Sequence, residues 1–582
     1  MMKKKIYFIA GFVAIAGFFQ SCSDSYLDET NPNTISSETY WSNLSESDAN
    51  LTSVYGAMLN NYLFSVDFEA WRSDLGFPKD RNLPYQLGVP WYTKSYNNNV
   101  KDYEKSWNAI YQVIFRANQV IEGLNGMNDE LKSQKKWSEQ MGQARFFRGL
   151  MHFYLHSNYN QGKIIIRDTN PEKLEEFSKK LSTAAEVLTF FRDDLIYAYK
   201  NLPAKFDQKS RVTAGTAAMI LGKSYLYTKE YTEAKLYLND VINNPSYGYQ
   251  LLEGENVKML FTEAGDFNTE SILEINYSSS HQTQEGTFDE ESFFNRFARL
   301  FAPTGTIKGQ ASIVPTAWLT YAYQSEELDS QDTRNYVSNG TGGTKLRNVP
   351  LRAAQFVALV NDEQSKYYNS DTANELVNFG RTTFSYFKKF TNHDIVSSEE
   401  DILETAWKSG KNLVVYRLAD AYLMQAECLT KTGDIDGAVK LINTIRKRWG
   451  LVLLGTSDGS AHDFNDEVYD ETTLMDQIMY VERPLELSCE GYAERAIDLR
   501  RWGVSKKRYQ DLAQLDFNLI DYTTDKGTKR AKSLLQQGLS ADPTDNSITI
   551  KEFKEAAANY NVGLNDYLPL PISEVLYNQN SK

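Results

Sequence analysis

The chain has 582 residues, of which 41% are hydrophobic and 24% are charged, which is the balance of a globular protein. Its 62 basic and 76 acidic side chains give a net charge of −14, the wrong sign for a protein that binds nucleic acid or docks on anionic lipid by charge. Aromatic residues make up 13% of the chain, and we expect most of them to pack the core.

The N-terminus has the pattern of a bacterial export signal. Three lysines at positions 3–5 precede an apolar run, Ile6–Phe19, that is too short to cross a bilayer as a helix. Cys22 follows directly and resembles the acylated cysteine of a lipobox. We therefore expect a signal peptide over 1–21, a lipid anchor on Cys22 and a polar tether over 22–39. The alternative is a plain secretory signal with an incidental cysteine.

Helical periodicity recurs in two parts of the chain, at about residues 40–250 and 411–510. Within them apolar residues return every three or four positions, which is typical of helices that bury one face. The predicted helices are Tyr40–Leu59, Ser106–Leu124, Trp137–His156, Thr213–Tyr227, Thr232–Ile242, Leu413–Thr430, Ile435–Arg448 and Leu474–Glu490. Pro484 is a candidate break in the last of them. The fold is therefore predicted to be mainly α.

Two helix pairs, Thr213–Ile242 and Leu413–Arg448, follow the pattern of a tetratricopeptide repeat. Gly222 and Ala234 are small enough to let the first pair approach closely. In the second pair Gly433 allows a left-handed end to one helix, Asp434 caps the next, and Ala438 takes the close-contact position. The pairs are far apart along the chain, which predicts a tetratricopeptide-like helix-pair scaffold with a large insertion and not a continuous solenoid.

Residues 251–410 lack helical periodicity and are rich in Ser, Thr, Asn, Gly and aromatic residues. Ser271–Tyr277 has the composition of a short strand, and Gly340–Gly343 is typical of a flexible loop. We expect an irregular, ligand-binding insertion, because long excursions from a rigid scaffold usually carry function. Residues 511–582 form a second loop-rich region, and 40–582 are expected to fold as one domain.

The segment from Phe64 to Asn99 combines aromatic and polar side chains in the way that a sugar site requires. Aromatic rings stack on the apolar face of a sugar, and Asp, Asn and Arg bind its hydroxyls. The candidate ligand-binding residues are Trp71, Arg72, Asp74, Arg81, Trp91, Tyr92, Tyr96 and Asn97, joined by Trp318 from the insertion. The alternative is that Trp71, Trp91 and Trp318 belong to the core and that the first two fix this segment to it.

Four glutamates, Glu482, Glu486, Glu490 and Glu494, recur at helical spacing with Arg483, Arg495, Arg500 and Arg501 nearby. Like charges on one helix face repel one another, so we expect arginines to contact them in structural ion pairs. A pair of carboxylates for glycoside hydrolysis is the less favoured alternative. We therefore expect no catalytic residue.

Histidines and cysteines offer few further sites. His152 and His156 are spaced to hold a metal on a helix, but no third ligand is evident, so we expect ordinary packing and no metal. Cys428 is expected to be a buried apolar residue, and Cys489 is placed in a helix without a role.

Several blocks resemble the SusD/RagB family of outer-membrane nutrient-binding lipoproteins. The blocks are Tyr26–Asp28 after Cys22, Ala144–Arg148, Tyr416–Leu423, Glu482–Leu487, Asp498–Gly503 and the closing Leu568–Pro571. The resemblance implies helix pairs of the tetratricopeptide type that carry an irregular ligand-binding half. It also implies a surface position over a TonB-dependent, SusC-like transporter, without catalysis or cofactor.

On this basis we expect a lipoprotein on the outer face of the outer membrane that binds oligosaccharide or polysaccharide and delivers it to the transporter. A minority of the family binds peptides, so a peptide-binding protein on the same scaffold is an alternative. Less favoured hypotheses are a surface glycoside hydrolase and a pure scaffold protein.

Overall fold

A computed structural model describes residues 41–79, 85–278, 293–401, 409–578 and 580. The predicted signal peptide, Cys22, the tether and Arg81 lie outside these ranges. Within them, no helix is long and apolar enough to cross a membrane. This part of the chain consists mainly of helices, with small sheets of two or three strands, which confirms the predicted fold class.

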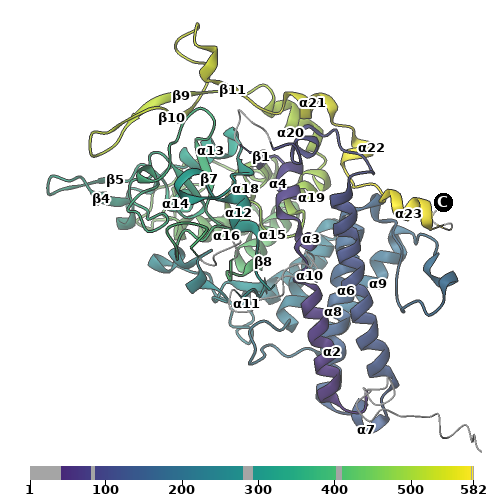
Figure 1. Cartoon of the computed structure of the whole chain (residues 1–582). Coiled ribbons are helices and arrows are strands. Elements are labelled where there is room, and N and C mark those ends of the chain that lie inside the picture. The colour runs from purple at the N-terminus through teal and green to yellow at the C-terminus, as the bar shows by residue number, and fades with distance from the viewer. Residues whose placement is uncertain (1–40, 80–84, 279–292, 402–408, 579, 581–582) are drawn as a thin grey trace, which may run out of the picture.

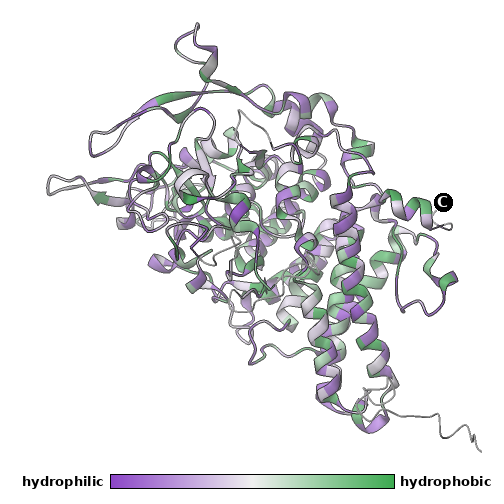
Figure 2. Ribbon diagram, in the orientation of Figure 1, coloured by the Kyte–Doolittle hydropathy of each residue, from purple (hydrophilic) through white to green (hydrophobic). Residues whose placement is uncertain are grey.

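Four long helices lie side by side along one flank of the molecule (Figure 1). They are α2 (Leu44–Ala57), α6 (Lys101–Gly126), α8 (Lys135–Asn158) and α9 (Ala184–Asn201). The sequence analysis missed α9, which begins at a capping box between Thr183 and Glu186. Hydrophobic and hydrophilic residues are interspersed along these helices in Figure 2, as expected where one face of a helix is buried.

The two predicted repeat pairs are present and adjacent in space. The first is α10 (Ala214–Tyr227) with α11 (Tyr231–Asn243), and the second is α15 (Leu418–Lys431) with α16 (Ile435–Arg448). A Cβ atom added to Gly222 would lie 2.8 Å from Leu238 Cγ, so the close approach requires glycine. Asp434 caps α16 as predicted, and α11 packs against α15. The helix-pair scaffold is therefore continuous although the insertion divides its sequence.

One predicted helix begins as a strand. Leu413–Arg417 forms β8, which pairs antiparallel with β2 (Ser271–Ile275), and the helix starts only at Leu418. The consecutive β-branched residues Val414 and Val415 favour the extended conformation. Cys489 was also placed wrongly, because it lies outside any helix with φ at 61°.

The insertion is built from short strand pairs and short helices. The pairs are β1 (Gly76–Pro78) with β3 (Ile313–Pro315), β4 (Tyr336–Ser338) with β5 (Thr344–Leu346), and β6 (Val357–Leu359) with β7 (Ser385–Phe387). Its helices are α12 (Phe297–Phe301), α13 (Ala317–Gln324) and α14 (Leu351–Phe356). The first strand pair is the important one, because it fastens the insertion to the N-terminal segment.

The remaining elements complete the scaffold and the C-terminal region. Helices in the first half are α3 (Asn61–Phe64), α4 (Val66–Arg72), α5 (Val89–Thr93) and α7 (Asp129–Lys132). Those in the second half are α17 (Glu471–Gln477), α18 (Arg483–Glu486), α19 (Glu494–Arg501), α20 (Ser505–Leu512), α21 (Lys554–Asn559), α22 (Val562–Asn565) and α23 (Ile572–Tyr577), with a π-helical turn at Ile478–Glu482. A sheet of β9 (Asp516–Thr523), β10 (Lys529–Gln537) and β11 (Thr549–Lys551) projects from the body (Figure 1).

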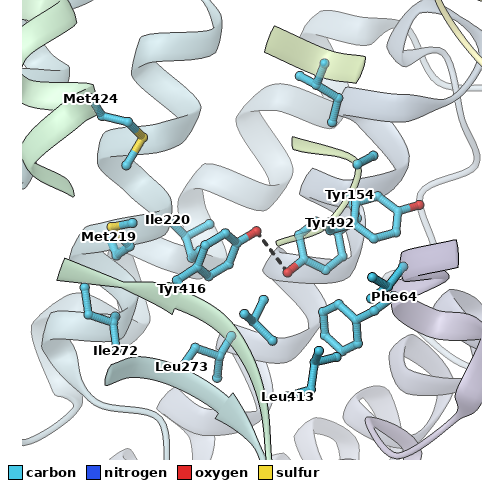
Figure 3. Packing of buried hydrophobic residues seen from close by; sticks show 14 of the residues in the cluster. Phe64, Tyr154, Met219, Ile220, Ile272, Leu273, Leu413, Tyr416, Met424 and Tyr492 are labelled. Atoms are coloured by element: carbon cyan, nitrogen blue, oxygen red, sulfur yellow. Dashed lines mark hydrogen bonds between the residues drawn. The ribbon is translucent and has the colours of Figure 1, made fainter. Parts of the chain in front are cut away.

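Tyrosines join the scaffold to the start of the insertion within one core. Tyr416 on β8 and Tyr154 on α8 share a hydrogen bond of 3.1 Å between their hydroxyls (Figure 3). Tyr154 stacks on Tyr492 with ring centroids 4.2 Å apart, and Leu273 of β2 lies in the same cluster. The scaffold therefore provides a rigid base on which the irregular half is mounted.

Candidate functional site

The N-terminal aromatic segment and the insertion meet at β1 and β3, where Phe77 pairs with Val314. Beside this pairing, the Thr316 hydroxyl donates to the backbone oxygen of Asp74 at 2.9 Å, and the Trp318 indole donates to the same oxygen at 2.5 Å. The structure therefore brings Trp318 to the segment that the sequence analysis selected.

The tryptophans of this segment lie in the core and not at a surface. Trp71 is 0% exposed, Trp91 is 1% exposed and Trp318 is 6% exposed. Trp91 stacks on Tyr96 with ring centroids 4.6 Å apart, so each ring covers a face of the other. A ring without exposed surface cannot stack on a sugar unless the core opens. The structure thus corrects their proposed role to packing, which was the alternative considered from the sequence.

The polar candidates are also buried and bond mainly within the protein, although Arg72 Nη1 has no hydrogen-bond partner among the described residues. Asp74 accepts from Arg495 Nε at 2.7 Å and from Arg508 Nε at 2.8 Å, and these guanidinium groups hold the pKa of its carboxyl far below the usual range although burial raises it. Arg72 donates to Glu69 at 2.9 Å. The Tyr92 hydroxyl accepts from a backbone N–H at 2.9 Å. These are structural contacts, so the ligand-binding role expected of Asp74, Arg72, Tyr92 and Tyr96 is corrected as well.

Asn97 is the one candidate in the described ranges that is exposed. Its side-chain oxygen accepts from the backbone N–H of Asn99 at 2.9 Å, which leaves the amide nitrogen facing outward. A ligand-binding role for Asn97 therefore remains a prediction.

Tyr85 packs against the buried Trp71 and remains partly exposed. Its ring centroid lies 5.7 Å from that of Trp71, and its backbone N–H donates to the oxygen of Pro78 at 3.2 Å. A Cβ atom on Gly88 would lie 2.7 Å from the Trp71 ring, so glycine lets the chain close over this layer. None of the described residues hydrogen bonds to the Tyr85 hydroxyl.

Arg299 of the insertion lies near Tyr85 and binds Gln310. Gln310 donates its backbone N–H to Arg299 O at 2.8 Å, and with its amide oriented so that the oxygen faces the guanidinium, that oxygen accepts from Arg299 Nη2 at 2.8 Å. Burial lowers the pKa of Arg299, and Arg296 lowers it further, while the nearby Tyr85 raises it. We call Tyr85, Arg299 and Gln310 the junction surface. None of the three was among the residues expected from the sequence.

The four glutamates are buried and neutralised, which argues against a hydrolytic pair. Glu486 is 0% exposed and accepts from Arg417 Nη1 and Trp449 Nε1, each at 2.8 Å, and also from Arg448. Its pKa is held far below the usual range, although burial raises it, because these guanidinium groups are so close. The others pair likewise, with Arg446 on Glu482 at 2.6 Å, Lys389 on Glu490 at 2.6 Å and Lys223 on Glu494 at 2.5 Å.

The prediction of arginine contacts is confirmed for Glu482, for Glu486 and for Glu490, which also pairs with Arg417 at 2.6 Å, but these arginines come from distant elements. The arginines near in sequence bind other partners. They are Arg483 on Asp420 and Asp498, Arg495 on Asp74, Arg501 on Glu427 and Asp498, and Arg500 over the Tyr567 ring at 3.8 Å.

The histidine pair has a packing role. His152 is buried, its Nδ1–H donates to Arg148 O at 2.8 Å, and its Nε2 accepts from Arg167 N at 3.3 Å. Both nitrogens are thus used by the neutral ring, and burial lowers the pKa of His152 to about 4. Among the residues that the structure describes, no group of three or more His, Cys, Asp or Glu side chains is placed to hold a metal.

Comparison with known proteins identifies the family. The sequence profile described as the SusD family matches residues 269–581, and a profile described as starch-binding associating with outer membrane matches residues 25–226. The chain belongs to the SusD family. Together the two profiles extend over both the scaffold and the insertion.

SusD-family relatives match along most of the chain. SusD-like protein P25 of Formosa agariphila is 23% identical over 519 residues, which cover 84% of this chain and 89% of the relative. A SusD superfamily protein of known structure from Bacteroides vulgatus has a TM-score of 0.68 at 20% identity and covers 94% of this chain and 99% of its own. A structure titled laminarin binding SusD-like protein has a TM-score of 0.62 at 21% identity, with 92% and 98% covered. These likenesses confirm the SusD fold.

Proposed function

We propose that this protein is a cell-surface lipoprotein that captures oligosaccharide or polysaccharide on the junction surface and delivers it to a TonB-dependent, SusC-like transporter. The observation that carries the binding site is the partly exposed Tyr85 near Arg299, which pairs with Gln310. The family supports the ligand class, because one matching profile is described as starch-binding and one similar structure is titled laminarin binding.

The junction surface offers the two kinds of contact that bind sugars. Tyr85 presents an aromatic face, on which the C–H face of a sugar ring can stack. Arg299 and Gln310 add polar groups near it. Their mutual bonds use Arg299 Nε and Nη2 and the Gln310 amide oxygen, which leaves the Gln310 amide nitrogen to donate to a sugar hydroxyl. Because the Trp71 ring supports Tyr85 from below, the platform is formed before the ligand arrives.

The site is proposed to bind without changing its ligand. The carboxylates that resembled a hydrolytic pair are enclosed by basic side chains, and Glu482 and Glu486 are both 0% exposed. A glycosidic bond and the attacking water cannot reach them.

The N-terminal sequence and the family support a lipid anchor for the protein and delivery of its ligand to a transporter. We propose that Cys22 carries the lipid and that residues 22–39 hold the body outside the outer membrane. The profile that matches residues 25–226 is described as associating with the outer membrane, which supports this position. Mass spectrometry of the protein from its native host would show acyl chains on Cys22, and an unmodified thiol there would contradict the anchor.

Affinity gels that contain single neutral polysaccharides test the binding proposal. We expect wild-type protein to be retarded by at least one of them, with laminarin and starch tried first. Tyr85→Ala should lose the retardation and keep its melting temperature, whereas Tyr577→Ala, which removes an 81% exposed tyrosine from α23, should change neither. Retention only on immobilised peptides would favour the peptide-binding alternative, and equal retardation of Tyr85→Ala and wild type would exclude the junction surface.

A further inference from the structure

A cavity of about 820 Å³ lies in the insertion, within the range of small-molecule sites. Five basic residues line it, and we call it the basic cavity. They are Lys258, Arg334, Arg347, Lys366 and Lys388, against the carboxylates of Glu255 and Asp394. An excess of positive charge in one cavity is unexpected in a protein whose net charge is −14.

Two of these cations are buried, and both lie near one carboxylate, that of Asp362. Lys388 is 2% exposed, donates to Ala354 O at 2.7 Å, and has its nearest carboxylate oxygen, on Asp362, 3.8 Å away. Arg347 is 8% exposed and donates through Nε to Val349 O at 2.5 Å. Its Nη groups form no hydrogen bond with any residue that the structure describes. Burial lowers the pKa of both side chains, although Asp362 raises it.

The acidic residues of the lining do not neutralise this pair. Asp394 accepts from Lys411 Nζ at 2.5 Å and from the backbone N–H of Glu263 at 2.8 Å. Glu255 forms an ion pair with Lys258 at the rim. Since Asp362 offsets the charge of Lys388, the excess charge rests on Arg347 and on the exposed Lys366.

His393 and Arg334 add no free charge of either sign. Burial lowers the pKa of His393 to about 3, so its ring is neutral at physiological pH. Arg334 pairs with Asp332 and donates Nη1 to Arg448 O at 2.8 Å. An anion that entered the cavity would thus meet Arg347, Lys366 and Lys388, and of these three only Lys388 forms an ion pair with a carboxylate of the described residues.

We propose that the basic cavity is a second saccharide site, specific for acidic sugars, in which Arg347 and Lys388 bind the carboxylate or sulfate. Tyr336, which is 41% exposed, offers an aromatic face at the same cavity. The side-chain oxygens of Gln355 and Asn369, whose amide nitrogens donate to protein oxygens, can accept from hydroxyls. The proposal rests on glycan binding as the function and extends it from neutral to charged sugars. Binding involves no covalent change.

Paired polysaccharide gels test this site. The probes are polygalacturonate and dextran sulfate beside their neutral counterparts, methyl-esterified pectin and dextran. We expect wild type to bind at least one acidic polymer more tightly than its neutral counterpart. Arg347→Gln should weaken that binding about tenfold or more, because a charge-assisted hydrogen bond is lost. Lys366→Gln should weaken it by a smaller factor, since Lys366 is exposed and its loss leaves the core intact.

The control is Lys440→Gln, which removes one exposed positive charge from α16 and should bind like wild type. Failure of wild type to bind either acidic polymer would overturn the proposal. So would equal binding by Arg347→Gln and wild type, or equal weakening in Lys440→Gln. Tyr85→Ala separates the two sites, because it should lose neutral glycans and keep the acidic polymer. If the protein still binds a neutral polysaccharide after such a result, only the basic cavity is excluded, and the proposal for the junction surface is unaffected.

Discussion

The indole nitrogen of Trp318 donates to the backbone oxygen of Asp74 across 2.5 Å, and this bond joins the insertion to the N-terminal segment. The carboxylate of Asp74 meanwhile binds Arg495 of α19 and Arg508 of α20. One residue thus connects three parts of the chain beneath the junction surface. The position of Tyr85 depends on this connection, because Tyr85 packs on the same buried layer.

Replacing Asp74 should destabilise the whole protein. Asp74→Asn leaves two buried guanidinium groups without a counter-charge, and we expect a loss of about 3–5 kcal/mol in the free energy of unfolding. Urea denaturation followed by circular dichroism measures it. Asp511→Asn, at an exposed ion pair with Lys507, should change the free energy by less than about 1 kcal/mol. A small effect at Asp74 would show that the segment is held by other contacts.

Trp91 should behave as a core residue. Trp91→Ala removes a side chain that is 1% exposed, and we expect it to cost about 3–5 kcal/mol of stability because a cavity remains. Differential scanning calorimetry should show a clearly lower melting temperature. If Trp91→Ala instead loses glycan binding with an unchanged melting curve, Trp91 is a ligand contact and its buried position does not describe the free protein.

Stability should fall in mild acid through His152. Its folded pKa is about 4, while an unfolded histidine titrates near 6.5. The stabilising effect of its neutral form is therefore complete above pH 6.5 and is lost as pH falls toward 4, by roughly 3 kcal/mol. Urea titrations at several pH values should show this slope, and His152→Gln should flatten it despite a lower starting stability. An unchanged slope in the variant would assign the acid sensitivity to other groups.

Glu486 should contribute strongly to stability and be irrelevant to hydrolysis. Glu486→Gln removes one of the two carboxylates that Arg417 and Arg448 share, the other being Glu270, and we expect about 3 kcal/mol of destabilisation. Wild-type protein should release no reducing sugar from any polysaccharide that it retains. Release of reducing ends that disappears in a folded Glu486→Gln variant would restore the hydrolase alternative.

The scaffold could be predicted from sequence because its determinants are local. Gly222, Ala234, Asp434 and Ala438 lie at the spacing that helix pairs require, and the structure places them there. Leu413–Arg417 was misassigned because a short apolar run fits a strand and a buried helix equally well. Pairing with β2, which is far away along the chain, stabilises this segment as a strand.

The candidate site could be predicted only in part. The segment around Trp71 and Trp91 does meet the insertion, but local sequence does not reveal which aromatic rings face inward. That is decided by distant partners such as Arg495 for Asp74 and Tyr96 for Trp91. The partners of Glu486 could not be predicted either, because they come from the distant elements β8 and α16.

A crystal structure of the protein with the neutral oligosaccharide that it retains would test the central claim most directly. We predict a sugar ring stacked on Tyr85, with hydroxyls bonded to Arg299 and Gln310, and with Trp71 still buried beneath. A sugar bound elsewhere, with Tyr85 untouched, would contradict the account.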